Sequence, residues 1–382
     1  MQKIKVLHIG IKNWPYDSVF TSTNNKRGGG SNKYANILIN GYSDKVESFI
    51  ITQLVNGQKR EEIYPNGIRV FRLKTFGGRK LRLIVLNVKS FFMAIKILYK
   101  FKFNVIHGHI LPGIISALLV GRMFKIPVIA TPYNVYDNGM KFRLNKIANS
   151  FEKYFYRHVD KLIFESNENR KKAQKLLNEP FDNSSVINTG IMIPNELFIN
   201  DFLQKPLKLL FIGRLVKVKA LDNLIKSFLC LKEEERKLIF LDIIGEGEEE
   251  TKLNEIIEKN SLSDFIKIHG FVPDLNVFIK NANIFILPSH TEGLSIALLE
   301  AMSNGLACIV NDVGIPFSKK EVFIMKNNHP KTIAEALTYF INNPTSIKSF
   351  VELSLKRIEK DFSIRSFTGN YINNYEVLMR KT

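Results

Sequence analysis

Short apolar runs of strand type alternate with longer amphipathic segments along the chain, and this alternation restricts the fold more than any other feature. In the first half the strand candidates are residues 4–10, 46–54, 68–73, 104–109, 127–133, 161–166 and 185–190. The series starts again with residues 207–213, 238–245, 266–270, 283–289 and 307–312. Segments with helical spacing of apolar residues stand between them, such as 222–231 and 295–302. This order predicts an α/β protein with parallel sheets.

A chain of 382 residues exceeds what one hydrophobic core usually supports, so two domains are expected. A polar stretch with two prolines, residues 194–206, interrupts the alternation. We therefore expect two Rossmann-like, doubly wound domains in series. The expected division is a basic N-terminal domain (1–195), a linker (196–206), a C-terminal domain (207–362) and a C-terminal helix (363–382) that crosses back to the first domain.

The positive charge is concentrated in the first half of the chain. The net charge is +19, and residues 1–205 hold 32 Lys and Arg against 14 Asp and Glu. This asymmetry indicates an anionic partner, such as nucleic acid, acidic lipid headgroups or a phosphorylated carrier. Residues 77–104 and 140–161 mix basic with large apolar residues at helical spacing, which is typical of helices on anionic membrane surfaces. The alternative is that their apolar residues only cover a sheet.

Targeting signals are not evident in the sequence. The N-terminal residues lack the apolar stretch of a signal peptide, and no run of about 18 apolar residues exists. Two cysteines far apart, without metal-ligand spacing, suit a reducing compartment. We expect a cytoplasmic protein, peripheral on the cytoplasmic face of a membrane.

The strongest chemical signal is the segment from Leu287 to Gly305, LPSHTEGLSIALLEAMSNG. A strand ends at its start, a turn holds Glu292, and a helix begins near Ser295, which is where open α/β sheets bind ligands. Glu300 follows eight positions after Glu292, so we expect both carboxylates on one helical face. Carboxylates accept hydrogen bonds from vicinal hydroxyls and so suit polyhydroxyl ligands. Two solvated helix glutamates are the alternative.

A second signal combines cations with glycines at strand ends. Arg214 and Lys219 follow a strand and can neutralise a diphosphate. Gly213 and Gly245 allow the backbone to approach a ligand closely. The glycines of residues 28–30 can form an anion-binding nest or a plain turn.

These motifs together resemble a known family. The run E-G-L-S-x-x-L-L-E-A-M-x-x-G resembles the E-x7-E motif of family 4 of the retaining glycosyltransferases, which have a GT-B fold with two domains facing a central cleft. Further resemblance lies in FIGRLVKVKALDNLIKSF (211–228), IIGEG (243–247), HGFVP (269–273), RGGGSNKYANIL (27–38) and VIHGH (105–109).

The resemblance implies roles for individual residues. Arg214, Lys219 and Glu292 are the expected catalytic residues, the two cations holding the diphosphate. Glu300 is expected at the ribose and Phe271 and Val272 at the base. The expected nucleotide-sugar site comprises Gly29, Gly30, Gly213, Gly245, Phe271, Val272, Gly293, Leu294, Ser295 and Glu300. Weaker expected contacts to acceptor or sugar are His109, Tyr133 and Asn134.

The resemblance also implies a reaction and its partners. A glycosyl group moves with retention from a nucleoside-diphosphate sugar, with UDP ahead of GDP, to a glycan or lipid-linked acceptor. Neither a cofactor nor a metal is expected, and nucleic acid is not an expected partner. Tyr133 stands where the family usually has a histidine, and Ala220 where it has a glycine. A donor-binding partner subunit without catalysis, or a GT-B sugar-nucleotide epimerase, remains the alternative.

Overall fold

The structure is a computed structural model and describes residues 3–15, 30–42, 44–55, 57–133, 146–194, 196–197, 201–292 and 294–380. The chain divides into two compact units, one of residues 1–190 with 364–382 and one of residues 191–363. Part of the expected linker belongs to the second unit, because Phe202 packs against that unit's core. The roles expected for the two halves stay predictions.

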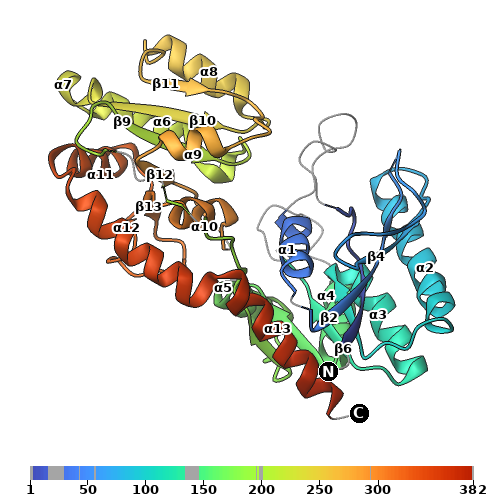
Figure 1. Cartoon of the computed structure of the whole chain (residues 1–382). Helices are drawn as coiled ribbons and strands as arrows, with labels where there is room; N and C mark the ends of the chain where they lie inside the picture. Colours follow the sequence, from blue (N-terminus) through green and yellow to red (C-terminus); the bar gives the residue numbers. More distant parts are fainter. Residues whose placement is uncertain are drawn as a thin grey trace. The chain divides into compact units, whose positions relative to one another are not determined.

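The first unit is built on a sheet whose described strands follow the order β3-β4-β2-β1-β5-β6-β7-β8 (Figure 1). Among these strands β3 alone is antiparallel to its neighbour. The strands are β1 (Ile4–Ile9), β2 (Val46–Gln53), β3 (Glu61–Ile63), β4 (Arg69–Leu73), β5 (Val105–His109), β6 (Val128–Thr131), β7 (Lys161–Phe164) and β8 (Ser184–Val186). The helices are α1 (Gly30–Asn40), α2 (Arg79–Leu98), α3 (Ile110–Phe124), α4 (Lys146–His158), α5 (Asn167–Leu177) and α13 (Ile364–Met379).

The second unit has a parallel sheet in the order β11-β10-β9-β12-β13-β14. Its strands are β9 (Leu207–Ile212), β10 (Ile239–Ile244), β11 (Ile266–Ile268), β12 (Ile284–Leu287), β13 (Ala307–Asn311) and β14 (Phe323–Met325). Its helical segments are η2 (Lys217–Lys219), α6 (Leu221–Cys230), α7 (Glu233–Arg236), α8 (Glu250–Lys259), α9 (Asn276–Asn281), α10 (Ile296–Ser303), α11 (Pro330–Asn342), α12 (Ser346–Arg357) and η3 (Ile358–Phe362).

The central strands of both sheets are buried on both faces, and most of their residues are apolar apart from the histidines of β1 and β5. In β1, for example, Val6, Leu7 and Ile9 are fully buried. Strands covered by helices on both sides read as continuous apolar runs, which is the pattern of parallel sheets. The expectation of two parallel-sheet domains is therefore confirmed. The strands β3 and β14 were not predicted. In β3 two of the three residues are glutamates, so this strand has no apolar run.

The C-terminal helix α13 completes the core of the first unit. It contacts α1 and β5 and buries Phe367, Tyr371 and Tyr375. These rings share a cluster with Tyr34 of α1 and Ile129 of β6. The last helix in the sequence is thus part of the unit that contains the first strand.

Candidate active site

The order of strands in the second unit reverses between β9 and β12. Ligands of open α/β sheets bind at such a switch point, beyond the carboxyl ends of the strands. The segment after β9 carries Arg214 and Lys219, and the segment after β12 carries Glu292. The backbone N–H of His290 donates to the carbonyl of Val218 at 2.8 Å, which joins the two segments. The topology thus brings the predicted catalytic residues together.

Close backbone contact between the loops after β9 and β10 requires the glycines there. Gly245 has φ +142°, and a Cβ on it would lie 1.8 Å from the carbonyl oxygen of Gly213. A Cβ on Gly247 would lie 2.0 Å from the carbonyl oxygen of Leu215. Backbone hydrogen bonds fix the approach, from Gly213 to Ile244 at 3.0 Å and from Leu215 to Glu246 at 2.9 Å. A side chain at either glycine would push the Arg214 loop away.

Lys219 and Glu292 form an ion pair within this site. Lys219 Nζ lies 2.6 Å from Glu292 Oε2, and the two side chains are 14% and 15% exposed. Arg214 is exposed and makes no such pair in the described part of the chain. One cation is therefore open to solvent, and the second is held by the carboxylate that was expected to bind the sugar.

The segment from Glu292 to Glu300 corrects one expectation. Helix α10 begins at Ile296, so Glu292 precedes it and the two carboxylates do not share a helical face. Ser295 is the N-cap, and its hydroxyl accepts from the N–H of Leu298 at 3.4 Å. Because the N-cap fixes where the helix starts, the residues between β12 and Ser295 are not helical. Glu300 lies on α10 and is half-buried.

Other residues of the predicted donor site lie around the same loops. Leu294 is half-buried, and Phe271 and Val272 follow β11, with Phe271 exposed. The N–H of Gly245 donates to the carbonyl of Gly270 at 2.8 Å, so the segment before Phe271 is tied to the glycine loop. Gly293, Gly29 and Asn134 lie outside the described residues, and Gly30 is the first residue of α1.

Three supporting residues were missed by sequence reasoning. The amide of Asn328 donates to the carbonyl of Pro288 at 2.8 Å and lies 2.9 Å from His290 Nδ1. The amide of Asn311 donates to the carbonyl of Ser289 at 3.0 Å. Asp242 Oδ1 accepts from His269 Nε2 at 2.6 Å. Both asparagines are buried, and a buried Asn at the end of an apolar strand such as β13 was the available signal.

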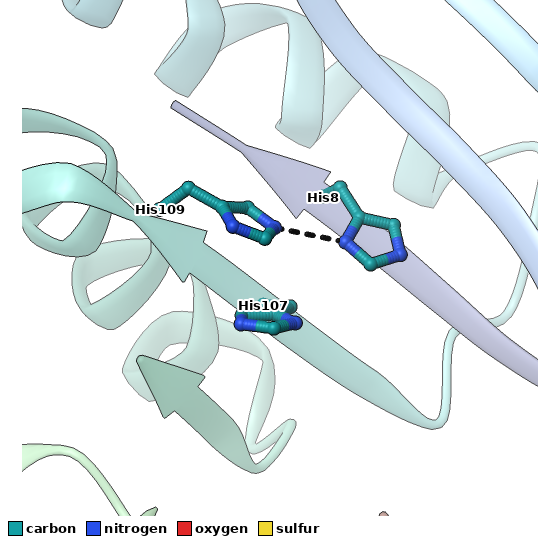
Figure 2. Close-up of side chains that lie close together, drawn as sticks. All are labelled: His8, His107 and His109. Atoms are coloured by element: carbon teal, nitrogen blue, oxygen red, sulfur yellow. Dashed lines mark hydrogen bonds between the residues drawn. The ribbon is translucent and has the colours of Figure 1, made fainter. Parts of the chain in front are cut away.

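The first unit has its own buried polar cluster, the histidine cluster of His8, His107 and His109 (Figure 2). His8 lies on β1 and the other two on β5, the neighbouring strands where the order of the first sheet changes direction. All three side chains are buried. Burial lowers the pKa of His8 to about 3 and the pKa values of His107 and His109 well below their usual range. The three rings are therefore neutral at physiological pH.

Hydrogen-bond donors can be assigned around His107 by following one hydroxyl after another. Tyr34 donates to the carbonyl of Ile187 at 3.0 Å, so Tyr371, 3.2 Å away, donates to Tyr34. Thr131 must then donate to Tyr371 at 3.0 Å. It follows that His107 Nε2 carries the proton and donates to Thr131 at 2.9 Å. The neutral ring is held in a single tautomer.

The chain of hydrogen bonds continues on the other side of the ring. His107 Nδ1 lacks a proton, so it accepts from the hydroxyl of Tyr375 at 2.9 Å. Tyr42 then donates to Tyr375 at 2.6 Å. Helix α13 thus supplies both Tyr371 and Tyr375 to a network that fixes β5 and β6.

The other two histidines form a separate pair. His109 Nε2 lies 3.0 Å from His8 Nδ1, and His109 Nδ1 lies 2.6 Å from the hydroxyl of Tyr133. His8 Nε2 is buried and has no partner among the described residues. Tyr133 has φ +41°, a left-handed conformation that is costly for an aromatic residue. Both His109 and Tyr133 are buried, and their predicted contact with acceptor or sugar stays a prediction.

The histidine cluster could be considered as a metal centre. Each ring offers one nitrogen, and these atoms lie within 4.8 Å of one another. However, both nitrogens of His107 are hydrogen-bonded, and its ring stacks on His109 with 4.0 Å between centroids and 24° between planes. Metal-ligating nitrogens converge in the planes of their rings. The stacked arrangement favours a hydrogen-bonded network.

Comparison with known proteins agrees with this geometry. The family model for glycosyl transferases group 1 matches residues 192–357, and the model for Glycosyltransferase Family 4 matches residues 28–193. The chain belongs to glycosyltransferase family 4, group 1. This family assignment confirms the resemblance found in the sequence. The residues matched by the two models adjoin near the boundary between the two units.

Individual relatives extend the comparison. An uncharacterised glycosyltransferase of Methanocaldococcus jannaschii is 30% identical over 59% of each chain. A putative colanic acid biosynthesis glycosyltransferase of Escherichia coli is 29% identical over 41% of this chain and 42% of its own. The chain spans 50% to 59% of the length of the first curated relatives that it matches.

Solved structures share the fold. Sucrose-phosphate synthase from Thermosynechococcus elongatus has a TM-score of 0.80 at 15% identity, with both chains fully covered. The Anabaena protein HepE, solved with UDP, has a TM-score of 0.75 at 12% identity, covering 98% of this chain and all of HepE. At these identities the likeness concerns the fold, which is that of GT-B glycosyltransferases.

Proposed function

We propose that this glycosyltransferase moves a sugar, with retention of configuration, from a UDP-sugar to a lipid-linked or cell-surface glycan precursor. The observation that carries the proposal is the ion pair between Lys219 and Glu292 beside the exposed Arg214, at the switch point of the second sheet. Two cations and a carboxylate at the ends of neighbouring strands suit the diphosphate and the hydroxyls of a nucleotide sugar.

The proposed reaction exchanges one bond at the anomeric carbon for another. The bond to the diphosphate oxygen breaks, and the bond to the acceptor hydroxyl oxygen forms on the same face of the sugar. The acceptor proton passes to the departing phosphate. Arg214 and Lys219 stabilise the charge that develops on the diphosphate, and because these cations supply that stabilisation we propose a reaction without metal or other cofactor. Glu292 holds the sugar hydroxyls.

Donor and acceptor are proposed on separate grounds. Structures of HepE contain UDP and UDP-glucose, which supports a UDP-sugar ahead of a GDP-sugar for a chain of the same fold. The relative named for colanic acid biosynthesis supports a cell-envelope polysaccharide as product. The excess of positive charge in the first 205 residues supports an acceptor at an anionic membrane surface and a cytoplasmic, peripheral location. The first unit is the proposed acceptor-binding unit.

Calorimetric titration with UDP, GDP, ADP and CMP tests the donor site. We expect micromolar binding of UDP, and a loss of at least about tenfold in the variant Arg214→Ala/Lys219→Ala, since each charge-assisted contact contributes about 1.5–3 kcal/mol. The control variant Lys237→Ala removes an exposed lysine of the same unit and should bind UDP as the wild type does. Failure of every nucleotide to bind would refute the proposal.

A turnover assay separates the enzyme from a donor-binding subunit without catalysis. The assay follows release of UDP from UDP-sugars in the presence of extracted lipid-linked glycan precursors. Release that requires both acceptor and an intact Glu292 supports the transferase. Binding of UDP with no release on any acceptor would favour the subunit, and a changed sugar on the nucleotide would favour the epimerase.

A further inference from the structure

Helix α2 has two apolar faces on opposite sides. Leu86, Ser90, Ala94 and Ile97 are buried against the unit's core. Turned away from them is a second set, spaced by three, four, four and seven residues: Leu81, Ile84, Val88, Phe92 and Tyr99. Since a helix turns by 100° per residue, this spacing places the second set in one stripe. Packing against the sheet accounts for the first face and leaves the second unexplained.

The neighbouring helices extend this surface. Helix α3 contacts both α2 and α4, and Arg122 of α3 donates to the carbonyl of His158 of α4 at 2.8 Å. The exposed apolar residues on these two helices are Leu119, Met123, Phe151 and Tyr154. We call the nine exposed apolar residues of α2, its C-cap Tyr99, α3 and α4 the apolar face. Their exposed fractions run from 48% to 82%.

The apolar face has a strongly one-sided charge around it. Residues 79–125, which contain α2 and α3, hold nine Lys or Arg and neither Asp nor Glu. Among the basic residues of α2 and α3 whose side chains the structure describes, which are Arg82, Lys89, Lys96 and Arg122, none forms an ion pair. On the helical projection Lys96 lies beside the apolar stripe of α2, and Lys89 lies midway between this stripe and the buried face. Positive charge therefore borders the apolar residues, with Glu61 and Glu62 of β3 lining a pocket together with Lys96 and Lys100.

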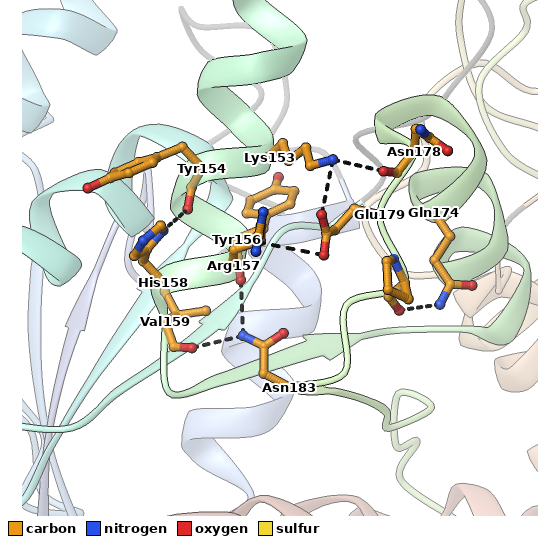
Figure 3. A network of polar contacts seen from close by, with 11 residues as sticks. Lys153, Tyr154, Tyr156, Arg157, His158, Val159, Gln174, Asn178, Glu179 and Asn183 are labelled. Atoms are coloured by element: carbon orange, nitrogen blue, oxygen red, sulfur yellow. Dashed lines mark hydrogen bonds and ion pairs between the residues drawn. The ribbon is translucent and has the colours of Figure 1, made fainter.

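Helix α4 adds apolar surface and little free charge. Lys153 and Arg157 both lie close to Glu179, at 3.0 Å and 3.7 Å, and Lys153 also donates to the carbonyl of Asn178 (Figure 3). This network joins α4 to the end of α5. The cations available to an outside partner are thus those of α2 and α3.

The apolar face together with the cations of α2 and α3 favours one kind of partner. A second copy of the chain would bring the two sets of α2 and α3 cations together without any acid between them, which is unfavourable. Nucleic acid would leave the apolar stripe without a partner. An anionic lipid bilayer takes both, because apolar side chains enter the acyl boundary while lysines meet the headgroups. No helix in the described ranges is long and apolar enough to cross a bilayer.

We propose that the apolar face docks on an anionic bilayer, with α2 lying in the interface and its lysines at the headgroups. This deepens the proposed function, on whose membrane-borne acceptor it rests. Insertion of Ile84, Val88 and Phe92 into the bilayer supplies binding that charge alone does not.

Co-sedimentation of the full chain with lipid vesicles tests the proposal. We expect binding to vesicles of phosphatidylcholine with phosphatidylglycerol, and much weaker binding to phosphatidylcholine alone. The variant Ile84→Glu/Phe92→Glu should lose about tenfold or more in affinity even at low salt, because two inserted side chains are replaced by anions. The matched control Val277→Glu/Leu353→Glu changes two exposed apolar residues of the second unit and should bind as the wild type does.

The outcomes are distinct. An equal loss of vesicle affinity in the test and control variants would overturn insertion. The same holds if salt abolishes vesicle binding and the Ile84→Glu/Phe92→Glu variant binds as the wild type does. A concentration-dependent dimer in sedimentation velocity that this variant dissociates, without vesicle binding, would make the apolar face a protein interface. Vesicle binding is measured without nucleotide, UDP titration reports the donor site of the second unit, and urea unfolding of the variant reports the folding of the first unit. Failure of the donor site and failure of docking are thereby separated.

Discussion

At the scale of single residues, the proposed donor site contains an ion pair that the proposed substrate would have to separate. Lys219 contacts Glu292 in the described state, whereas the proposed reaction needs the lysine at the diphosphate and the carboxylate at the sugar. Exposed ion pairs contribute about 1 kcal/mol or less. In this pair, which is 14% and 15% exposed, the cost of removing both charges from water offsets part of their attraction. We therefore expect a small opposing effect of Glu292 on binding of the free nucleotide.

Replacement of Glu292 by Gln tests this opposition. The variant should bind UDP about as tightly as the wild type or up to about fivefold tighter, since Lys219 is released. Its transfer rate should fall by about 100-fold or more, because the sugar loses a charged acceptor. Calorimetry and a UDP-release assay measure the two quantities. Weaker UDP binding, matching that of Lys219→Ala, would mean that the carboxylate orients the lysine instead of competing for it.

Ala220 is a second residue whose conformation makes a prediction. It has φ +52° and ψ +37°, a left-handed conformation in which a Cβ is unfavourable, and it is buried directly before α6. The variant Ala220→Gly should be more stable by about 1 kcal/mol in urea unfolding. Ala297→Gly, inside α10, serves as the control and should be less stable by a similar amount. A destabilised Ala220→Gly protein would show that the methyl group's packing outweighs the strain.

At the scale of elements, α13 is held to the first unit by hydroxyl groups as well as by apolar contacts. Tyr375 donates to His107 Nδ1 and accepts from Tyr42, and all three side chains are at least partly buried. The helix therefore belongs to the structure that fixes β5, whose end carries His109. Loss of the Tyr375 hydroxyl should therefore weaken the attachment of both α13 and β5.

The variant Tyr375→Phe removes the hydrogen-bond partner of the Tyr42 hydroxyl and of His107 Nδ1. We expect a loss of about 2 kcal/mol in the free energy of unfolding, because buried polar groups without partners cost about 1–3 kcal/mol. Tyr339→Phe on α11, where the ring is exposed, should change stability by less than about 0.5 kcal/mol. Urea unfolding followed by tyrosine fluorescence compares them. Similar stabilities for the two variants would argue against the assigned network.

At the scale of the whole molecule, the histidine cluster couples folding to pH. Burial lowers the pKa of His8 from 6.5 to about 3 and lowers those of His107 and His109, so the unfolded chain binds protons more readily than the folded one. The stabilising contribution is complete above about pH 6.5 and is lost as the pH falls towards 3. Each histidine contributes a slope of up to about 1.4 kcal/mol per pH unit in this window.

Unfolding in urea at several pH values between 7 and 4 measures this slope. Stability should fall with acid, and the variant His8→Asn should show a shallower slope by about one proton. The control variant His329→Asn changes an exposed histidine of the second unit and should leave the slope unchanged. A flat profile in the wild type would mean that the folded and unfolded chains take up the same number of protons, which would contradict the lowering of these pKa values by burial.

The alternation of strand and helix in the sequence determined most of this architecture. Buried parallel strands are mostly apolar, and glycines, Ser295 and the acidic motif mark where strands end and α10 begins, so the sequence predicts these elements locally. The loop cations Arg214 and Lys219 and the carboxylate Glu292 were placed at neighbouring strand ends for the same reason. The short strands β3 and β14 were missed, whereas β8 and β11, of the same length, were predicted from the longer apolar runs that contain them.

Tertiary structure alone decided which distant side chains meet. The pairing of Lys219 with Glu292 spans 73 positions, and that of His107 with Tyr375 spans 268. The second apolar face of α2 reads in sequence like any core-facing stripe, and only the packing of the opposite face leaves it exposed. Local patterns fix an element's type because backbone geometry is local. Partners and exposure depend on contacts between segments far apart in the chain, so they follow from the assembled fold.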